Sequence, residues 1–479
     1  MSAKPLEKPS NASPTKPNQP YSAYYMRSAP VIDTQITHAG PGTPLGELMR
    51  RFWQPICLSE QLRDVPLAVR ILNEELVVFK DGKGQIGVLQ KQCCHRGASL
   101  EYGIIQECGI RCCYHGFHFD IDGTILEAPA ARDKGERLAK NLAQGAYPAM
   151  ERDGLIFAYM GPPESRPPFA EYDAFEKRGD TRLVAFSNIY PCNWLQVIDN
   201  IADQMHTSFL HNMPYLYNGN VPEGLPWEDV SLPSFAATPI MDYVEVRNGT
   251  AMCFIAGRRM GEDKVWIRIQ DCIVPNMTEH AYLFEQGNEH RIFHRVSMAR
   301  WYVPVDDHNC IIFGWRTFGK EADPLQRGTE ERVGYDNMDF LMGQVGNRSY
   351  EEAQRLPGDW EAITSMGPIV SHERENPIDS DAGVYMFRKL LRNAVDSGSN
   401  MADNYLSRAF KGQQYYCYTQ NNVLAIPKRD SKTADEALIR TVGRKIIELC
   451  QQADELDPDA RRDFMTTGLL QLEKTAATL

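Results

Sequence analysis

The chain lacks any long apolar run. No stretch approaches the roughly 18 to 20 apolar residues that cross a bilayer, and the first thirty residues contain no apolar segment typical of a secretory signal. Its 12 cysteines in 479 residues are too sparse for a disulfide scaffold. These absences favour a cytoplasmic protein without a membrane segment, whose cysteines serve as thiols or metal ligands.

Positive charge is also scarce. Lys and Arg number 51 against 63 Asp and Glu, which gives a formal net charge of −12. This balance argues against nucleic acid as a partner, although it does not identify a substrate. With 43% hydrophobic residues over 479 positions, the chain can build two domains that each have a core.

Composition and turn signals divide the chain into four parts. Residues 1–35 form a tail rich in Pro, Lys and Ser, which has too little apolar surface to become ordered and is expected to be flexible. A small β domain is expected at 36–168, ending at the Pro-rich segment GPPESRPP. A catalytic domain is expected at 169–435 and a helical segment at 436–479.

Hydrophobic periodicity predicts helices packed on one face of an antiparallel sheet, an α+β fold. In the small domain we expect a helical stretch at 45–55, followed by strands at 68–72, 76–80 and 86–90. In the larger domain the expected strands are 182–189, 251–256, 265–273, 294–303 and 310–318, and the expected helices are 193–211, 381–397 and 433–475.

A glycine pattern in the small domain imitates a dinucleotide fingerprint. Gly82, Gly84 and Gly87 have the required spacing, but a strand follows them where the fingerprint needs a helix. The helix N-terminus that would hold the phosphates is therefore missing. We expect no nicotinamide or flavin site in this chain.

Two short Cys/His motifs, 16 residues apart, form the first candidate metal site. Each motif pairs one thiolate with one imidazole, which suits a two-iron, two-sulfur cluster with two Cys on one iron and two His on the other. A structural zinc is the alternative, although zinc sites usually pair cysteines on one loop. Gly97 and Gly116 follow the histidines and allow sharp turns. The candidate ligands are Cys93, His95, Cys112 and His115.

A second motif of different chemistry combines two carboxylates with two imidazoles. On a helix at 193–211, capped by Asn193, the side chains of Asp199, Asp203 and His206 would share one face. In a core these groups need a cation, while on a surface they would be an ordinary acidic face. His211 follows five residues after His206, so the helix must loosen between them. Two His and one carboxylate make a facial triad for iron(II); the carboxylate is Asp203 or a more distant residue.

With both motifs present in this order, the chain resembles the Rieske non-haem iron oxygenases, most of all the phthalate dioxygenase-like branch, whose oxygenases contain alpha subunits only. The resemblance runs from about residue 40 to about residue 391. It is carried by the segments CCHRGASLEYG, CCYHGFHFDIDG, NWLQVIDNIADQMHTSFLH and GDWEAITSMGPI. Cys94, Cys113 and Phe117 depart from the usual family residues.

The resemblance implies a small all-β Rieske domain joined to a helix-grip (START-like) catalytic domain. It assigns the [2Fe-2S] cluster to Cys93, His95, Cys112 and His115. It assigns the mononuclear iron to His206, His211 and a distant aspartate, which by position is Asp359, with Asp199 and Glu361 as alternatives. Asp203 would then bridge His206 and the cluster ligand His115 of a neighbouring subunit, in a homotrimer or a hexamer of stacked trimers.

The resemblance also implies the reaction. Electrons from an NADH-dependent reductase, which carries flavin and an iron-sulfur centre, would support dioxygen activation and ring cis-dihydroxylation of an aromatic carboxylate. Oxidative O-demethylation of an aryl ether or another monooxygenation is the alternative within the enzymes. A metal-binding electron carrier is the alternative outside them, and it leaves the second motif unexplained.

An acidic substrate needs a cation in its pocket. In the segment WIRIQ, strand alternation places Trp266, Arg268 and Gln270 on one face. Arg268 is therefore the candidate substrate anchor, and Arg258 and Arg259 are alternatives. An arginine engaged in an ordinary ion pair is the plainer interpretation.

Overall fold

The computed structural model describes residues 20, 23, 31–211, 237–281, 296–320, 322, 328–339, 343–476 and 479. Most of the tail expected at 1–35 lies outside these residues, as do the first two residues of the strand expected at 294–303; the last two residues of the tail already belong to the short helix α1 (Thr34–Thr37). Among the described helices, none has both the length and the apolar character that crossing a bilayer requires.

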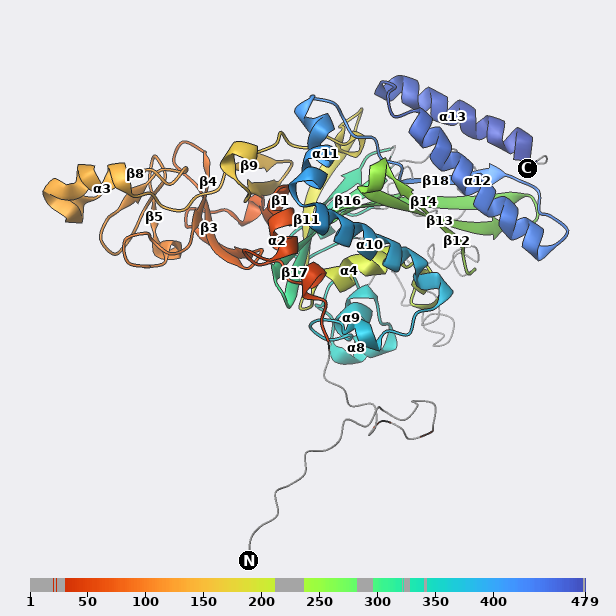
Figure 1. Cartoon of the computed structure of the whole chain (residues 1–479), viewed down its shortest axis with the longest axis horizontal. Helices are drawn as coiled ribbons and strands as arrows, with labels where there is room; N and C mark the ends of the chain where they lie inside the picture. Colours follow the sequence, from red (N-terminus) through yellow and green to blue (C-terminus); the bar gives the residue numbers. More distant parts are fainter. Residues whose placement is uncertain are drawn as a thin grey trace, which may run out of the picture.

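A small β region and a larger α+β region lie along the long axis of the molecule (Figure 1). The small region contains two antiparallel sheets, of order β2-β3-β4 and β5-β6-β7-β8. It has a hydrophobic core of its own, in which Val77, Phe79 and Phe119 are fully buried. Its strands are β2 (Leu67–Ile71), β3 (Glu74–Lys80), β4 (Ile86–Gln90), β5 (Ile104–Ile105), β6 (Ile110–Arg111), β7 (His118–Phe119) and β8 (Ile125–Glu127).

A third sheet joins the small region to the large one. Its order is β1-β10-β9, with β1 at Trp53–Leu58, β9 at Ala149–Arg152 and β10 at Leu155–Tyr159. Phe157 of this sheet contacts the rings of Trp301 and Trp315 in the large region, with centroids 5.6 and 5.8 Å apart. The two regions therefore share a packed aromatic contact.

The large region is built on an antiparallel sheet of eight strands among the described residues. Seven follow the order β11-β17-β16-β15-β14-β13-β12, and β18 pairs with β14. The α+β prediction is confirmed, as are the expected strands, of which 294–303 is described only from residue 296. The strands are β11 (Arg182–Tyr190), β12 (Ile240–Val246), β13 (Ala251–Met260), β14 (Lys264–Ile273), β15 (Met277–Ala281), β16 (Val296–Asp306), β17 (Asn309–Phe318) and β18 (Gln420–Ala425).

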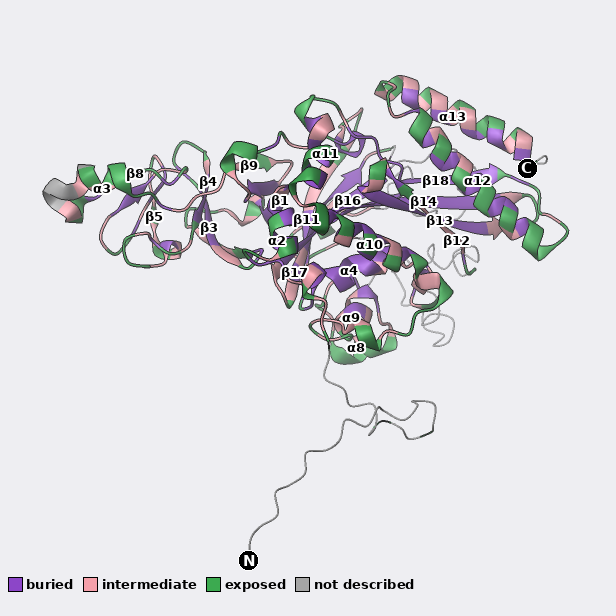
Figure 2. Cartoon of the chain, viewed as in Figure 1, coloured by how far each residue is buried: buried purple, intermediate pink, exposed green. Residues whose placement is uncertain are grey.

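Helices cover both faces of this sheet, which forms a buried layer between them (Figure 2), so the expectation that they pack on one face only was wrong. On one face, Gly383 lets α10 approach β12, since a Cβ there would lie 2.2 Å from the ring of Tyr243. On the opposite face, a Cβ on Gly443 of α12 would lie 2.3 Å from Ile255. We call the first face the α4 face, because Gly383 also lies against the end of α4. The main helices are α4 (Trp194–Ala202), α10 (Ala382–Ser397), α11 (Ser399–Phe410), α12 (Lys432–Gln452) and α13 (Pro458–Thr475).

Three of the expected helices differ from the structure. The stretch at 45–55 is helical only at Pro44–Met49 (α2) and then continues as β1. The helix expected at 433–475 is two helices, because Pro458 begins α13 and cannot continue α12. The helix expected at 381–397 is confirmed as α10.

The third difference falls on the second metal motif. Asn193 caps α4 as expected, accepting from Leu195 N at 3.1 Å, but α4 ends at Ala202 and Asp203 is extended at φ −93° and ψ 104°. Asp203 Oδ1 accepts from Met205 N at 2.8 Å. This side-chain turn replaces the helical hydrogen bonds and starts the short α5 (His206–Phe209).

Candidate functional site

Two loops with the same hydrogen-bonding pattern carry the first metal motif. In one loop Gly97 N donates to Cys93 O at 2.8 Å, and in the other Gly116 N donates to Cys112 O at 3.1 Å. Both glycines are left-handed, with φ of +77° and +73°. Each turn can close in this way because a glycine follows the histidine, as the sequence indicated.

The two loops bring the candidate ligands of the same type together. The rings of His95 and His115 lie 4.7 Å apart, and Cys93 and Cys112 are each 3% exposed. The Cys93 thiol donates a hydrogen bond to Cys94, and this bond together with burial raises the pKa of Cys93, while burial raises the pKa of Cys112. Two thiolates here therefore need a cation, which fits a cluster with both sulfurs on one iron and both imidazoles on the other.

The other cysteines of the small region make different contacts. All twelve cysteines of the chain are described and none forms a disulfide. Cys94 N donates to Gln144 Oε1 at 2.7 Å, while Cys113 is exposed. The carbonyl of Cys108 is hydrogen-bonded to His118 Nε2 at 2.6 Å, so His118 is occupied structurally.

The second candidate centre joins segments that are remote in sequence. His206 begins α5, His211 follows it, and Asp359 begins α9 (Asp359–Thr364). Asp359 Oδ1 lies 3.6 Å from His206 Nε2 and 3.4 Å from His211 Nε2. One ligand atom from each residue falls within 4.8 Å of the others. Donors about 2.1 Å from a shared ion lie about 3.0 to 3.4 Å apart, so the three groups fit a metal after a small contraction.

Both alternative carboxylates are engaged elsewhere. Asp199 Oδ2 accepts from the Arg388 guanidinium at 2.6 Å, and burial nevertheless raises the pKa of Asp199 to about 6. Glu361 pairs with Arg348 at 2.5 Å and caps α9 through Gly358 N. Among the candidate carboxylates, only Asp359 has an oxygen close to the Nε2 atoms of both His206 and His211. Asp199, Glu361 and Asp203 do not belong to this group.

Asp203 lies behind His206 on the side away from Asp359. Its Oδ2 is 3.7 Å from His206 Nδ1, while the Nε2 atom of the same ring faces Asp359. Burial opposes charge on both groups, but their attraction lowers the pKa of Asp203 and raises that of His206. The Asp203 side chain is 30% exposed and lines a surface cavity of about 360 Å³. His206 is thus linked to the surface through one carboxylate.

Asp359 has a buried partner that sequence reasoning missed. Gln344 Nε2 donates to Asp359 Oδ2 at 2.6 Å, and Asn200 Nδ2 lies 3.5 Å from Oδ1. Burial opposes ionisation of Asp359, but His211, His206 and Gln344 together lower its pKa below the usual range. Gln344 stands in an irregular segment, so no periodicity in the sequence could have indicated it.

The expected anchor Arg268 lies on the α4 face of the sheet. It is 5% exposed, and its Nε atom has no hydrogen-bond partner among the described residues. Burial and repulsion from Arg258 and Arg300 lower the pKa of Arg268 to about 9. A buried guanidinium with two cationic neighbours requires a compensating anion.

The two alternative arginines have clear structural partners. Arg259 forms an ion pair with Asp435 at the start of α12. Arg258 Nη2 donates to Thr207 Oγ1 at 2.9 Å, which ties β13 to α5. This contact also places the α4 face, and with it Arg268, on the side of the sheet that holds the two histidines.

Two further polar residues on this face were not expected from the sequence. Gln270 Nε2 donates to Nδ1 of His280 at 2.7 Å, and Gln270 Oε1 has no partner in the described part of the chain. Burial, followed by the charges of Arg300 and Arg268, depresses the pKa of His280 well below its usual value. The neutral ring leaves the positive charge of this face to its arginines.

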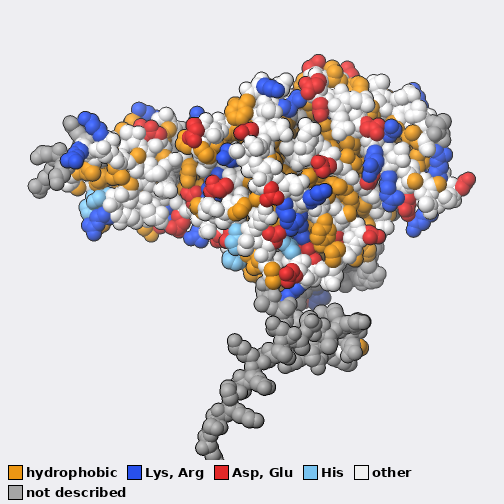
Figure 3. Space-filling view, viewed as in Figure 1, with side chains coloured by type: hydrophobic (Ala, Val, Ile, Leu, Met, Phe, Trp, Pro, Cys, Tyr) orange, Lys and Arg blue, Asp and Glu red, His pale blue; other side chains and the backbone are white. Residues whose placement is uncertain are grey.

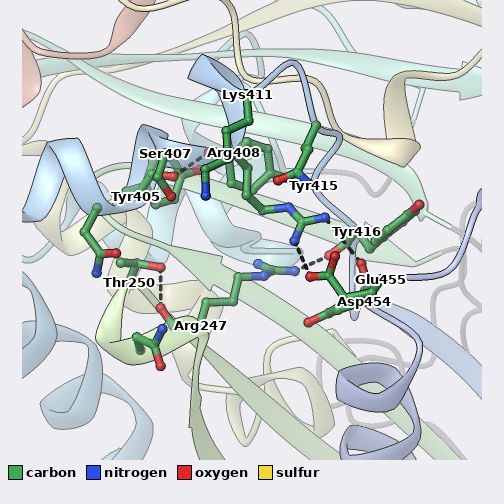
Figure 4. A pocket seen from close by; sticks show the side chains of 13 residues that line it. Arg247, Thr250, Tyr405, Ser407, Arg408, Lys411, Tyr415, Tyr416, Asp454 and Glu455 are labelled. Atoms are coloured by element: carbon green, nitrogen blue, oxygen red, sulfur yellow. Dashed lines mark hydrogen bonds and ion pairs between the residues drawn. The ribbon is translucent and has the colours of Figure 1, made fainter.

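A separate cavity of about 420 Å³ lies between α11 and the turn that precedes α13 (Figure 4). It is lined by Arg247, Arg408 and Asp454 among other polar residues. Arg247 pairs with Asp271 at 3.0 Å and Arg408 with Glu455 at 2.9 Å. Both arginines of this cavity are thus ion-paired, and none of the candidate metal ligands lines it.

Comparisons with known proteins agree with the geometry. The Rieske [2Fe-2S] domain model matches residues 52–144. The tert-butanol monooxygenase / tert-amyl alcohol desaturase oxygenase subunit of Aquincola tertiaricarbonis is 46% identical over 460 residues, which are 95% of this chain and 96% of that protein. The phenoxybenzoate dioxygenase subunit alpha of Ectopseudomonas oleovorans is 33% identical, over 76% of this chain and 84% of that protein. The chain belongs to the Rieske non-haem iron oxygenases.

Solved structures support the same fold. NdmA of Pseudomonas putida CBB5, as a mutant with theobromine, gives a TM-score of 0.52 at 20% identity, over 76% of this chain and 96% of that one. Dicamba monooxygenase bound to dicamba gives 0.51 at 18% identity, over 73% of this chain and 98% of that one. As a Rieske oxygenase the chain is an enzyme with a [2Fe-2S] cluster and a mononuclear non-haem iron. The zinc and electron-carrier alternatives are therefore excluded.

Proposed function

We propose that this Rieske oxygenase is the terminal component of a system that hydroxylates an aromatic carboxylate with dioxygen and electrons from an NADH-dependent reductase. One observation supports this proposal most directly: two histidines and one carboxylate meet on the same side of the sheet as a buried arginine, Arg268, whose Nε atom has no hydrogen-bond partner among the described residues. In this proposal His206, His211 and Asp359 hold the iron. Cys93, His95, Cys112 and His115 hold the cluster.

The iron, when bound, supplies dioxygen activation, and the protein's own groups prepare its surroundings. The triad leaves neighbouring coordination positions free for dioxygen and substrate. Asp203 faces His206 Nδ1 at 3.7 Å, so a small approach lets it accept that N–H and keep Nε2 directed at the metal. Burial of Asp359 and His211 excludes water from the protein side of the site.

Electron transfer is proposed to cross a subunit interface. Histidine side chains reach the surface of the small region (Figure 3), in accord with the exposed His95 and the half-buried His115. The loops that carry them lie at the end of the molecule away from α4 and α9 (Figure 1). The cavity at Asp203 has an apolar rim, with Met366 58% exposed. A trimer, or a hexamer of stacked trimers, would set the cluster of one subunit against Asp203 of the next.

Arg268 supports the acidic substrate. A carboxylate on the α4 face would accept a hydrogen bond from Arg268 Nε and balance its charge, and Gln270 Oε1 would accept a hydrogen bond from a neighbouring donor; neither atom has a partner in the described part of the chain. The aromatic ring would then lie between this anchor and the metal ligands. The proposed reaction is ring cis-dihydroxylation.

The experiment is product analysis with purified oxygenase, a surrogate reductase, ¹⁸O₂ and a panel of aromatic acids. We expect a labelled cis-diol, about three irons per chain and acid-labile sulfide. Protein without sulfide that holds only zinc would refute the assignment of both metal sites. Full activity with NADH in the absence of any reductase would refute the need for that partner.

The relative from Aquincola tertiaricarbonis favours a second candidate, monooxygenation of a small tertiary alcohol, because the identity of 46% extends over 95% of the chain. O-demethylation of an aryl ether is the remaining alternative, as in the 29% identical 5,5'-dehydrodivanillate O-demethylase oxygenase subunit. One labelled oxygen in a diol made from tert-butanol would support the alcohol reaction. Release of formaldehyde would support demethylation.

A further inference from the structure

The two oxygens of Asp359 have different surroundings. Oδ1 faces the Nε2 atoms of His211 and His206 at 3.4 and 3.6 Å. Oδ2 accepts a hydrogen bond from Gln344 Nε2 at 2.6 Å. Asp359 is 9% exposed and Gln344 is 5% exposed, so water does not compete strongly for either group. Among the described residues, Oδ1 has only the long contact from Asn200 Nδ2 at 3.5 Å and faces both imidazoles, whereas Oδ2 is held by a short hydrogen bond.

Gln344 is fixed relative to the helix that carries Asp359. Its main-chain oxygen accepts from the Tyr190 hydroxyl at 3.2 Å, and Trp360 N donates to Gly343 O at 2.8 Å. Gly343 has a φ of +79° and lies so close to α9 that a Cβ on it would be 2.5 Å from Gly358 Cα. The amide of Gln344 is therefore held in place before any metal binds.

A carboxylate can bind a metal through one oxygen or through two. Two histidines and one oxygen fill three positions of an octahedral iron, and a second carboxylate oxygen would fill a fourth. We propose that Gln344 is a positioning residue whose amide holds Oδ2 of Asp359, so that the carboxylate binds iron through Oδ1 alone and keeps that fourth position open. This inference rests on the proposed iron ligands His206, His211 and Asp359.

A purely structural role for Gln344 would stabilise the fold and leave the iron unchanged. The positioning role changes how the iron binds small molecules. The readout is the ferrous nitrosyl adduct, whose electron paramagnetic resonance signal reports the open positions and the ligand symmetry while the oxidised cluster remains silent. A second readout is the iron(II) dissociation constant of protein from which only the mononuclear iron has been removed.

The test variant is Gln344→Met, which keeps the length of the side chain and removes the donor. We expect a nitrosyl signal of altered symmetry, nitric oxide affinity lowered about 10- to 100-fold, and kcat lowered by a similar factor with KM for the organic substrate within about twofold. The conservative variant Gln344→Asn keeps the amide on a shorter side chain, so its nitric oxide affinity and kcat should lie between those of the wild type and of Gln344→Met. It replaces the Met variant in the test if that variant does not fold.

The matched control is Gln196→Leu. Gln196 is equally buried and its amide also binds near α9, donating to Ile363 O at 3.0 Å and Gly367 O at 2.9 Å, but it does not touch Asp359. Its nitrosyl signal should match the wild type. Wild-type signals and affinities in a folded Gln344→Met or Gln344→Asn protein would overturn the inference.

His211→Ala separates this inference from the proposed site. Loss of one iron per chain in His211→Ala, together with a wild-type nitrosyl signal in the Gln344 variants, would reject only the positioning role. Retention of all iron in His211→Ala would reject the iron site itself, and the positioning role with it.

Discussion

The two metal centres of this oxygenase are assembled in opposite ways. The proposed cluster ligands come from two neighbouring loops, each closed by its own main-chain hydrogen bonds and a left-handed glycine. The proposed iron ligands come from α5, the segment that follows it and α9, and only the packing of the large region brings Asp359 to His206 and His211. A locally built centre can be recognised from sequence spacing, whereas a centre built by tertiary contacts depends on residues that carry no local signal.

The largest effects should follow from removing one ligand at each centre. Cys112→Ser should abolish the cluster and its visible absorption while the mononuclear iron remains. Asp359→Ala should do the reverse, lowering iron from about three to about two per chain with the cluster spectrum intact. Both variants should reduce product formation to background. The measurement is iron and sulfide content together with the absorption spectrum of each variant.

Loss of both metals in either variant would contradict the independence of the two centres. Arg355→Ala serves as the control. Its side chain is 69% exposed and pairs with Glu351 on the surface of α8 (Tyr350–Arg355), so metal content should not change.

Asp203→Asn should slow electron transfer between the two metal centres while both centres keep their metals. The amide keeps the shape of the side chain but removes the charge that faces His206 Nδ1 at 3.7 Å. We expect full iron content, normal reduction of the cluster, and product formation lowered about 10- to 100-fold. Stopped-flow absorption of cluster reoxidation in the presence of substrate and dioxygen is the measurement.

Asp459→Asn is the matched control for Asp203→Asn. Asp459 is a carboxylate far outside the site, with a side chain 88% exposed. Cluster reoxidation at the wild-type rate in Asp203→Asn would show that the carboxylate does not connect the two centres.

The sequence predicted the two centres unequally. Cys93, His95, Cys112 and His115 could be grouped by spacing alone because their loops are local. For the iron, the residues left Asp203 and a distant carboxylate open, and only the resemblance to the family indicated Asp359. The helix break after Ala202 was also missed, because Asp203, Gln204 and Met205 include neither Pro nor Gly. The turn arises from a hydrogen bond of the Asp203 side chain.

The α+β fold and most strands followed from periodicity, since strand alternation records which face is buried. The pairing of the strands could not be predicted in this way, because β18 pairs with β14 in the middle of the sheet although it lies more than a hundred residues further along the chain. For the same reason, the sequence could not indicate that Gln344 contacts Asp359. Its contact with Asp359 exists only because the loop at Gly343 packs against α9.

Arg268→Met should affect substrate binding more than chemistry. Removing the guanidinium would leave the substrate carboxylate without its charged partner, which costs about 1.5 to 3 kcal/mol. We therefore expect the apparent KM for an aromatic acid to rise about 10- to 100-fold, while the methyl ester of the same acid is little affected. Arg259→Met is the control, because Arg259 pairs with Asp435 at the start of α12. An unchanged KM for the acid would show that Arg268 does not bind the substrate carboxylate.

The smallest effects should come from two glycines that share a conformation but not surroundings. Gly97 in a cluster loop and Gly343 beside α9 have φ of +77° and +79°. A Cβ on Gly97 would meet nothing within 4 Å, whereas one on Gly343 would lie 2.5 Å from Gly358 Cα. Gly97→Ala should therefore cost only backbone strain, about 1 kcal/mol of unfolding free energy, and keep its cluster.

Gly343→Ala should cost the same strain and in addition displace α9, so its mononuclear iron should be lost more easily during dialysis against a chelator. The comparison needs thermal unfolding and iron retention for both variants. Equal iron retention in the two would mean that the α9 contact does not set the position of Asp359. In that case the iron centre would depend on local structure as much as the cluster does.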